Sequence, residues 1–221
     1  MGSVYNGELV TSRHDDSEYL AMVNVYMDYI KTHKENVLKA FYYLSNKLIE
    51  TDLLGERTSK VIAQLEEEVK AHDDSKYSNE EFEPYRRHFD PTEKEKMIDK
   101  DNEEIAKLVE EEYEKAWEHH YKNNKHHPEY WRFVERKDGN VVPIDTPSEV
   151  GEEMDLVSLL HMVCDWSGMS LKFRNTFSPV SWYNTQAKDE RAVLNPKTKE
   201  ALKIILEKIY NEEVLDEIEE R

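Results

Sequence analysis

The chain has 221 residues and a formal net charge of −18, from 30 basic and 48 acidic side chains. This length can bury a sizeable core, as one domain or as one domain with an appendage, and 13 tyrosines and 4 tryptophans argue against a disordered chain. The acidic balance excludes broad binding to a nucleic-acid backbone, because no excess of cations is left to neutralise phosphates. A small phosphorylated substrate is not excluded, since a bound divalent metal reverses the local field.

Helical periodicity dominates the first half of the chain. Apolar residues recur at spacings of three and four, which predicts one buried face on each helix. Ser17 can cap the first helix, and Ser78 with Glu81 forms a capping box for a short one. The predicted helices cover residues 18–50, 57–71, 78–88 and 92–122, with room for a kink near residues 31–33.

The second half combines one hairpin with helices. The turn sequence 137–140 separates two apolar pairs, which is typical of a β-hairpin near residues 133–142. Ser148 is placed to cap a helix, and Asn195-Pro196 is a cap followed by a proline in the first helical turn. The predicted helices cover residues 149–172 and 197–210, with an irregular aromatic loop over residues 173–194. We therefore expect an all-α fold, a single helical bundle with one small hairpin, over residues 17–221 after a flexible tail over residues 1–16.

The cysteine content and the lack of long apolar runs bear on location. Cys164 is the one cysteine, so the chain cannot form an internal disulfide, and this fits a reducing cytosol. Its apolar neighbours favour a small buried hydrophobe. No apolar run approaches the ~18 residues that a membrane span needs, and residues 1–16 lack a signal-peptide pattern. We expect a cytoplasmic protein without a membrane partner.

Histidine is concentrated in one stretch of the chain. The segment AWEHHYKNNKHHPEYW, residues 116–131, holds four of the nine histidines. Imidazole is the commonest transition-metal ligand, and carboxylate is its usual oxygen partner. Asp165 lies in the apolar run VSLLHMVCDWSGMS, where an unpaired carboxylate would be costly to bury, and His161 lies one turn before it. The candidate metal ligands are His33, His72, Asp73, His120, His126, His127 and Asp165, with His161 supporting them from behind.

The order His33, His72-Asp73 and Asp165 resembles the H…HD…D signature of the HD superfamily of metal-dependent phosphohydrolases, which has an all-helical fold. The intervening His120 and His126 or His127 resemble the extra ligands of its two-metal subclass. His72-Asp73-Asp74-Ser75-Lys76 is similar to the H-D-x-G-K form of HD-GYP phosphodiesterases, with serine in place of glycine and without the GYP element. The HDxSK, HHPEYW and CDW motifs also resemble those of small, functionally uncharacterised phage and bacterial proteins, which implies a bacterial cell or a phage-infected host.

This resemblance implies hydrolysis of a nucleotide or similar small phosphoester. One or two divalent ions, drawn from Mn, Fe, Co, Ni or Zn, would lower the pKa of bound water and polarise a phosphoryl oxygen. Asp73 would be the shared catalytic ligand, and Lys76 would hold the substrate phosphate as a point charge. Further candidate substrate contacts are Asn124, Tyr130 and Trp131.

Two other classes of function fit the same residues. The ligand order also resembles di-iron oxygenases of this superfamily, which would carry out oxidative chemistry. The third hypothesis is a non-catalytic interaction protein whose metal ion is fully coordinated by protein ligands. The sequence leaves open the substrate, the choice between mono- and diester, the number of ions and the oligomeric state.

Overall fold

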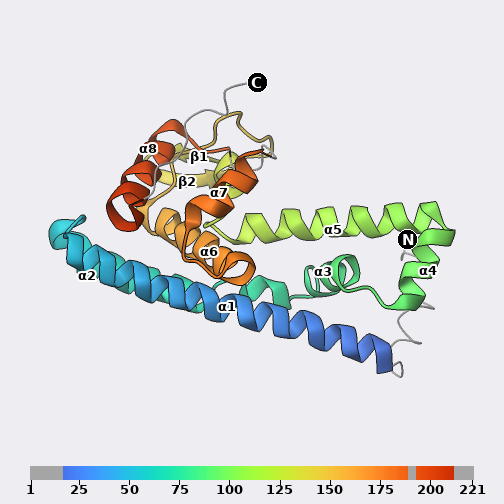
Figure 1. Ribbon diagram of the computed structural model, residues 1–221. Coiled ribbons are helices and arrows are strands. Elements are labelled where there is room, and N and C mark those ends of the chain that lie inside the picture. Colours follow the sequence, from blue (N-terminus) through green and yellow to red (C-terminus); the bar gives the residue numbers. More distant parts are fainter. Residues whose placement is uncertain (1–16, 189–192, 212–221) are drawn as a thin grey trace, which may run out of the picture. The chain divides into compact units, whose positions relative to one another are not determined.

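The computed structural model describes residues 17–188 and 193–211, so the tail predicted over residues 1–16 lies outside the described residues. The fold is all-α with one two-stranded antiparallel sheet, as predicted (Figure 1). The α-helices are α1 Ser17–Thr51, α2 Thr58–Lys70, α3 Phe82–Phe89, α4 Glu93–Asp101, α5 Glu103–Asn123, α6 Leu156–Arg174, α7 Pro179–Lys188 and α8 Pro196–Ile205. Short turns of other helix types are η1 Gly55–Arg57, η2 Asp74–Tyr77, η3 Pro128–Arg132 and η4 Leu206–Tyr210.

The chain divides into two compact units. Unit 1 contains residues 1–32 and 74–120, and unit 2 contains residues 33–73 and 121–221. Each has its own apolar core, and α1 contributes to both because its residues fall on either side of the division. The single domain expected over residues 17–221 stays a prediction. Across the described parts of both units, no helix combines the length and the apolar character needed to cross a membrane.

The core of unit 1 is small and aromatic. Tyr26, Ile30, Tyr85 and Ala116 are its buried members. The ring of Tyr26 meets that of Phe82 edge-on with centroids 5.2 Å apart, an arrangement favoured by the charge distribution of aromatic rings. This core brings together one end of α1, α3 and α5.

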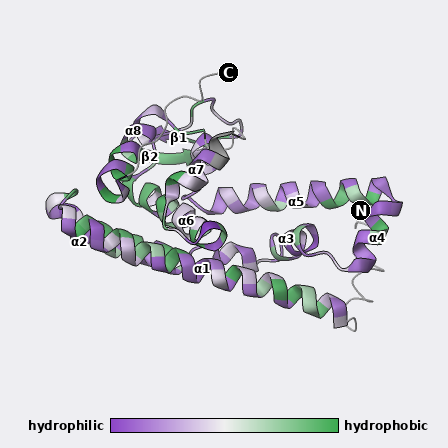
Figure 2. Cartoon of the chain, in the orientation of Figure 1, coloured by the Kyte–Doolittle hydropathy of each residue, from purple (hydrophilic) through white to green (hydrophobic). Residues whose placement is uncertain are grey.

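Unit 1 also corrects two helix boundaries. The helix predicted over residues 92–122 is two helices, because Asn102 leaves the helical conformation and its Oδ1 accepts hydrogen bonds from the backbone of Glu104 and Ile105 at 3.2 Å. Asn102 thus starts α5, whose ribbon is mostly hydrophilic in Figure 2. The capping box expected at Ser78 is absent from α3, which has no side-chain cap. Instead, Thr92 and Glu95 form a capping box on α4.

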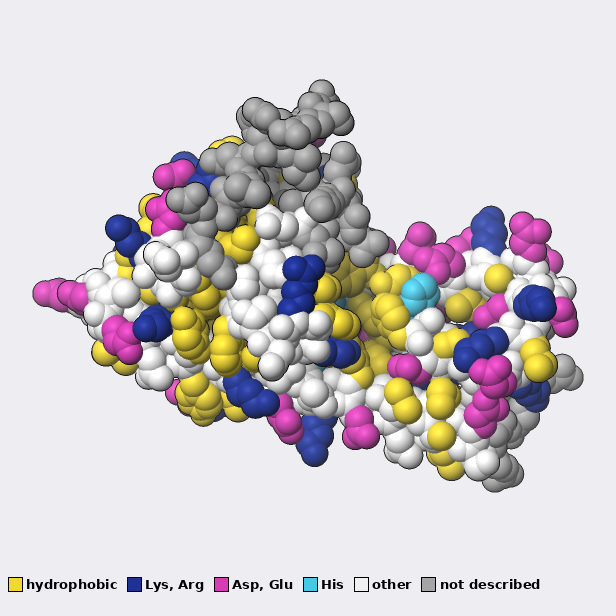
Figure 3. Space-filling view, viewed as in Figure 1, with side chains coloured by type: hydrophobic (Ala, Val, Ile, Leu, Met, Phe, Trp, Pro, Cys, Tyr) yellow, Lys and Arg dark blue, Asp and Glu magenta, His cyan; other side chains and the backbone are white. Residues whose placement is uncertain are grey.

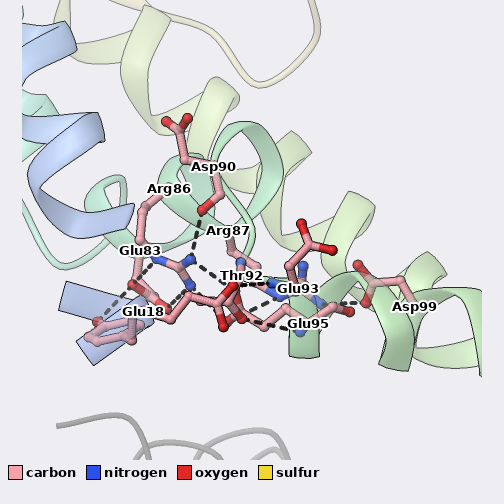
Figure 4. A network of polar contacts seen from close by, with 10 residues as sticks. Glu18, Glu83, Arg86, Arg87, Asp90, Thr92, Glu93, Glu95 and Asp99 are labelled. Carbon is pink, nitrogen blue, oxygen red and sulfur yellow. Dashed lines mark hydrogen bonds and ion pairs between the residues drawn. The ribbon is translucent and has the colours of Figure 1, made fainter. Parts of the chain in front are cut away.

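A buried guanidinium connects α3 with α4. All five N–H groups of Arg86 are matched by acceptors: the carboxylates of Glu83 and Glu95 and the backbone oxygen of Asp90, at 2.7 to 3.1 Å (Figure 4). Beside it, Arg87 pairs with Asp99. Burial alone would lower the pKa of Arg86, but the hydrogen bonds to the two carboxylates raise it above its usual value.

The core of unit 2 is built around α6. Most residues from Ser158 to Ser170 are buried, which explains why this helix is apolar on nearly all sides. It begins at Leu156 with Asp155 as its cap, so the start predicted at Ser148 is wrong, because residues 149–155 precede the helix. The loop predicted over residues 173–194 contains α7, which packs on α6. Cys164 is fully buried, as expected.

The predicted hairpin is present. Strand β1, Val134–Lys137, pairs with β2, Asn140–Pro143, and Lys137 stands opposite Asn140. Asp138 and Gly139 have φ values of 52° and 83°, as a two-residue hairpin turn requires. The last predicted helix also forms, with Asn195 as its cap and Pro196 in its first turn.

Gly168 permits a close approach of α6 to α1. A Cβ atom at this position would lie 2.9 Å from Val37 Cγ2 and 3.0 Å from the backbone nitrogen of Val37. The contact lies three residues from Asp165 on one helix and four from His33 on the other. The close contact at Gly168 therefore sets the spacing of α1 and α6, the helices that carry the candidate ligands His33 and Asp165.

Candidate metal centre

Four side chains of unit 2 converge from three separate parts of the sequence. His33 lies on α1, His72 and Asp73 follow α2, and Asp165 lies on α6. His33 Nε2 is 2.9 Å from His72 Nε2, 3.1 Å from Asp165 Oδ1 and 3.7 Å from Asp73 Oδ2. His72 Nε2 is 3.4 Å from Asp73 Oδ2 and 3.7 Å from Asp165 Oδ1. The structure thus brings these four predicted ligands together.

The spacing of the four atoms suits a transition metal. Ligand atoms about 2.1 Å from an ion lie roughly 3.4 Å apart in a tetrahedron and about 3.0 Å apart as neighbours in an octahedron. The separations just given run from 2.9 to 3.7 Å. Two imidazoles and two carboxylates form a mixed nitrogen and oxygen set, which suits a transition metal better than Mg²⁺ or Ca²⁺. His33, His72 and Asp73 of this cluster form a buried group that could hold a metal ion.

Asp73 has a backbone conformation that few residues adopt. Its φ is 55°, in the left-handed region, and the residue is 2% exposed. The left-handed conformation costs about 1–2 kcal/mol, and aspartate is one of the residues that tolerate it. A buried carboxylate must also be compensated by a positive or hydrogen-bonding partner. Strain of this kind is often retained at functional sites. Of the aspartates with positive φ in the described part of the chain, Asp73 is the one that is buried, and it is also the residue predicted to be the shared ligand.

Burial keeps His72 and the neighbouring His126 neutral at physiological pH. It lowers the pKa of His72 well below its usual value, and neighbouring imidazoles add to the effect while Asp73 opposes it. Burial likewise lowers the pKa of His126 to about 4. Little histidine shows on the face drawn in Figure 3. Because a metal binds the neutral form of histidine, these rings are in the right state for ligation.

The carboxylate of Asp165 is held in its charged form. Burial by itself would raise its pKa, but the hydrogen bond with His33 lowers the pKa below its usual value. The cluster therefore contains an anionic oxygen beside the neutral ring of His72, and carboxylate and neutral imidazole are the forms that a divalent cation binds.

His126 and His127 occupy different positions in unit 2. His126 is buried, and its Nε2 is 3.4 Å from Asp73 Oδ1, longer than a good hydrogen bond. That nitrogen has no hydrogen-bond partner among the residues the structure describes. His127 is half-buried, with its ring centroid 4.3 Å from that of His126. A ring nitrogen of His127 also lies within 4.8 Å of a carboxylate oxygen of Asp73, so both histidines lie near enough to Asp73 to share an ion with it.

His161 lies behind His72, as the sequence predicts. Its Nε2 is 2.9 Å from His72 Nδ1, and its Nδ1 is 3.7 Å from Glu68 Oε2. The interaction with His161 lowers the pKa of Glu68 despite the opposing effect of burial. His72 therefore has one ring nitrogen toward the ligand cluster and the other toward His161.

His120 belongs to unit 1, where a carboxylate orients its ring. His120 Nδ1 is 2.8 Å from Glu81 Oε2, and His119 Nδ1 is 2.7 Å from Glu81 Oε1. Ser75 Oγ lies 3.3 Å from His120 Nδ1. With Nδ1 bonded to the carboxylate, Nε2 carries the lone pair, as in histidines that ligate metals. That His120 is itself a ligand stays a prediction.

The predicted substrate contacts lie in both units. In unit 1, Lys76 is buried on η2, with its ammonium 5.7 Å from the ring centroid of Tyr29. In unit 2, Asn124 and Tyr130 are half-buried. Trp131 is part of the core, and its indole N–H donates to the backbone oxygen of Lys125 at 2.7 Å. Their contact with a substrate stays a prediction.

The chain matches, over residues 22–208, the family described as "Family of unknown function (DUF5662)". It belongs to that family. No match was found among curated proteins or among solved structures. The DUF5662 match includes every candidate ligand, from His33 to Asp165.

Sequence reasoning missed two carboxylates of this DUF5662 chain. The sequence indicates no role for Glu68, and it predicts Glu81 only as part of a capping box. The side chain of Glu81 is fully buried against two histidines. One signal could have indicated it: an adjacent pair of histidines on an apolar helix face needs a partner, and the acidic residues of the preceding helices are the candidates.

Proposed function

We propose that this chain is a metal-dependent phosphohydrolase that acts on a nucleotide or a similar small phosphoester. The observation that carries the proposal is the convergence of His33, His72, Asp73 and Asp165, with ligand atoms 2.9 to 3.7 Å apart in a buried cluster. The likeness of their order to the H…HD…D signature supports phosphoester hydrolysis over other reactions of a metal site.

Each of the four residues has its own role in this proposal. His33 and His72 supply neutral nitrogen donors, while Asp73 and Asp165 supply the negative charge that balances a divalent cation. A bound ion of this kind lowers the pKa of a water ligand and polarises a phosphoryl oxygen. The buried position of the four side chains keeps bulk water away from the donor atoms and strengthens their electrostatic interactions.

The first experiment is metal analysis of the purified protein, followed by a phosphate-release screen over mono-, di-, tri- and cyclic nucleotides with Mn, Fe, Co, Ni or Zn. We expect metal-dependent release of phosphate or of a nucleoside monophosphate from at least one of them. Oxygen uptake with iron, and no hydrolysis, would favour the oxygenase reading. Tight metal binding without either reaction would favour a non-catalytic metal protein.

The variant Asp73→Asn, with Asp52→Asn as its control, tests the shared carboxylate. Both aspartates have left-handed backbones, with φ values of 55° and 50°, and asparagine tolerates that conformation. Asp52 is exposed in the turn after α1. We expect Asp73→Asn to lose metal and activity together, and Asp52→Asn to keep both. If the two variants retain the same metal content and activity, Asp73 is not part of the site.

A further inference from the structure

Three side chains of unit 2 form a line from the surface to the candidate ligands. The side chain of Glu68 is 42% exposed, whereas those of His161 and His72 are 4% and 0% exposed. Glu68 Oε2 is 3.7 Å from His161 Nδ1, and His161 Nε2 is 2.9 Å from His72 Nδ1. The other nitrogen of His72, Nε2, faces His33 and the two aspartates.

The charge of Glu68 favours one direction for the hydrogen bond between His161 and His72. Glu68 Oε2 lies 3.7 Å from His161 Nδ1, beyond hydrogen-bond distance, but its negative charge attracts an N–H group and repels a lone pair, so it favours the proton on Nδ1. A neutral imidazole has one N–H and one lone pair, so His161 Nε2 must then accept, and His72 Nδ1 must donate to it. This leaves the lone pair of His72 on Nε2, directed at the candidate metal position.

The opposite direction of the hydrogen bond between His161 and His72 is unfavourable both beside Glu68 and at the candidate metal position. If His161 Nε2 donated to His72, the lone pair of His161 Nδ1 would face the carboxylate of Glu68. His72 Nε2 would then carry a proton toward the position of a cation. The charge of Glu68 therefore favours the first arrangement, and it acts on His72 through His161.

We propose that His161 and Glu68 are positioning residues that hold His72 in the Nδ1–H tautomer, ready to bind a metal through Nε2. The proposal rests on the metal centre of the proposed function. It does not require that the reaction be phosphoester hydrolysis. Outer partners of ligating histidines typically affect metal affinity by about 10- to 100-fold.

The first test needs neither a metal nor a substrate. Two-bond ¹H–¹⁵N correlation spectra of the metal-free, ¹⁵N-histidine-labelled protein report the tautomer of each ring. We expect the Nδ1–H form for both His72 and His161. The Nε2–H form of His72 in the wild-type protein would overturn the proposal, whatever the variants do.

The second test measures Zn²⁺ affinity by competition with a chromophoric chelator. His161→Phe fills the space without an acceptor, whereas His161→Gln places an amide oxygen where it can accept from His72. We expect His161→Phe to weaken affinity by about 10- to 100-fold, His161→Gln to recover most of the loss, and Glu68→Gln to show a smaller loss. His88→Phe is the control, since His88 pairs with Glu110 at 3.2 Å in unit 1.

The stoichiometry of binding separates this role from direct ligation. At saturating Zn²⁺ we expect the same number of ions per chain in His161→Phe as in the wild-type protein. The loss of one ion would make His161 a ligand and overturn the proposal, as would unchanged affinity. Failure of the phosphate-release screen would remove the proposed reaction, but the tautomer and the affinity would still decide the role of His161.

Discussion

The Nε2 atoms of His33 and His72 lie 2.9 Å apart, although 39 positions separate the two residues. Two imidazole nitrogens at this distance either share a proton or direct both lone pairs at one cation. The second arrangement agrees with the hydrogen-bond direction inferred for His72 and with the two carboxylates beside the pair. If the cluster binds a metal as we propose, folding and metal binding should be linked in this protein.

Thermal unfolding with and without metal tests this linkage. A metal that binds only the folded protein, at 100 times its dissociation constant, stabilises it by about 2.7 kcal/mol. We expect saturating Zn²⁺ or Mn²⁺ to raise the melting temperature of the wild-type protein, and a chelator to reverse the rise. His33→Asn should show little response because one of four donors is lost, whereas His88→Asn should respond as the wild type does.

Glu81 should make the stability of unit 1 depend on pH. Its carboxylate accepts from His119 and His120, and these hydrogen bonds lower its pKa although burial opposes them. Because the folded pKa is below the unfolded value of about 4.5, the stabilisation is complete above pH 4.5. It is lost as the pH falls through the folded pKa.

Chemical denaturation of Glu81→Gln between pH 3 and 7 checks this. An amide oxygen can satisfy one histidine but not both, so we expect a loss of about 1.5–3 kcal/mol at pH 7, typical of hydrogen bonds to a charged group. The difference from the wild type should shrink below pH 4.5. A difference that stays constant over the whole range would contradict the role of the charge.

The fold and the residues that converge at the candidate site could be predicted because their signals are local. Apolar spacing gave α1, α2 and α8, and the turn residues Asp138 and Gly139 gave the hairpin. The candidate ligands could be identified because histidine and aspartate are unusual on apolar helix faces. The break at Asn102 was not predicted, because the apolar residues before and after it keep the spacing of one continuous helix. Glu68 and Glu81 were missed because a carboxylate in a sequence with 48 acidic residues carries no local sign of its partner.

Arg86 should be among the most important residues for the stability of unit 1. Its guanidinium is fully buried and bonds to Glu83, Glu95 and the backbone of Asp90. Arg86→Met removes the cation that Glu83 and Glu95 share and leaves Glu95 with the longer pair to Arg87 at 3.6 Å. Breaking a buried ion pair in this way costs about 3–5 kcal/mol. Urea denaturation measures the loss. The exposed pair of Lys96 with Glu93 is the control, and Lys96→Met should change the midpoint little.

Cys164 should be unreactive in the folded protein. Its thiol is fully buried, and burial raises its pKa, so the thiolate that attacks disulfide reagents is scarce and inaccessible. We expect Ellman's reagent to report no free thiol under native conditions and one per chain in denaturant. Rapid reaction in the native state would show that α6 opens readily.

In Gly168→Ala, helix propensity and packing have opposite effects on the free energy of unfolding. Alanine is favoured over glycine by about 1 kcal/mol inside a helix, so propensity alone predicts stabilisation. The new methyl group, however, would meet Val37 Cγ2 at 2.9 Å and the backbone nitrogen and Cα of Val37 at 3.0 and 3.2 Å. A side chain can rotate away, but the backbone of α1 cannot move without shifting His33. We expect packing to dominate, because overpacking of a core costs about 1–3 kcal/mol.

The double variant Gly168→Ala with Val37→Ala separates the two kinds of contact. Removing the γ-methyl groups of Val37 relieves only the nearest contact, so the backbone contacts should keep the added methyl group unfavourable. Measured against Val37→Ala alone, Gly168→Ala should therefore still lower the free energy of unfolding, but by less than in the wild-type background. It should also weaken Zn²⁺ binding, since α1 and α6 carry His33 and Asp165. A stabilised Gly168→Ala protein with unchanged metal affinity would show that α1 adjusts freely, and that this glycine does not set the spacing of the two ligands.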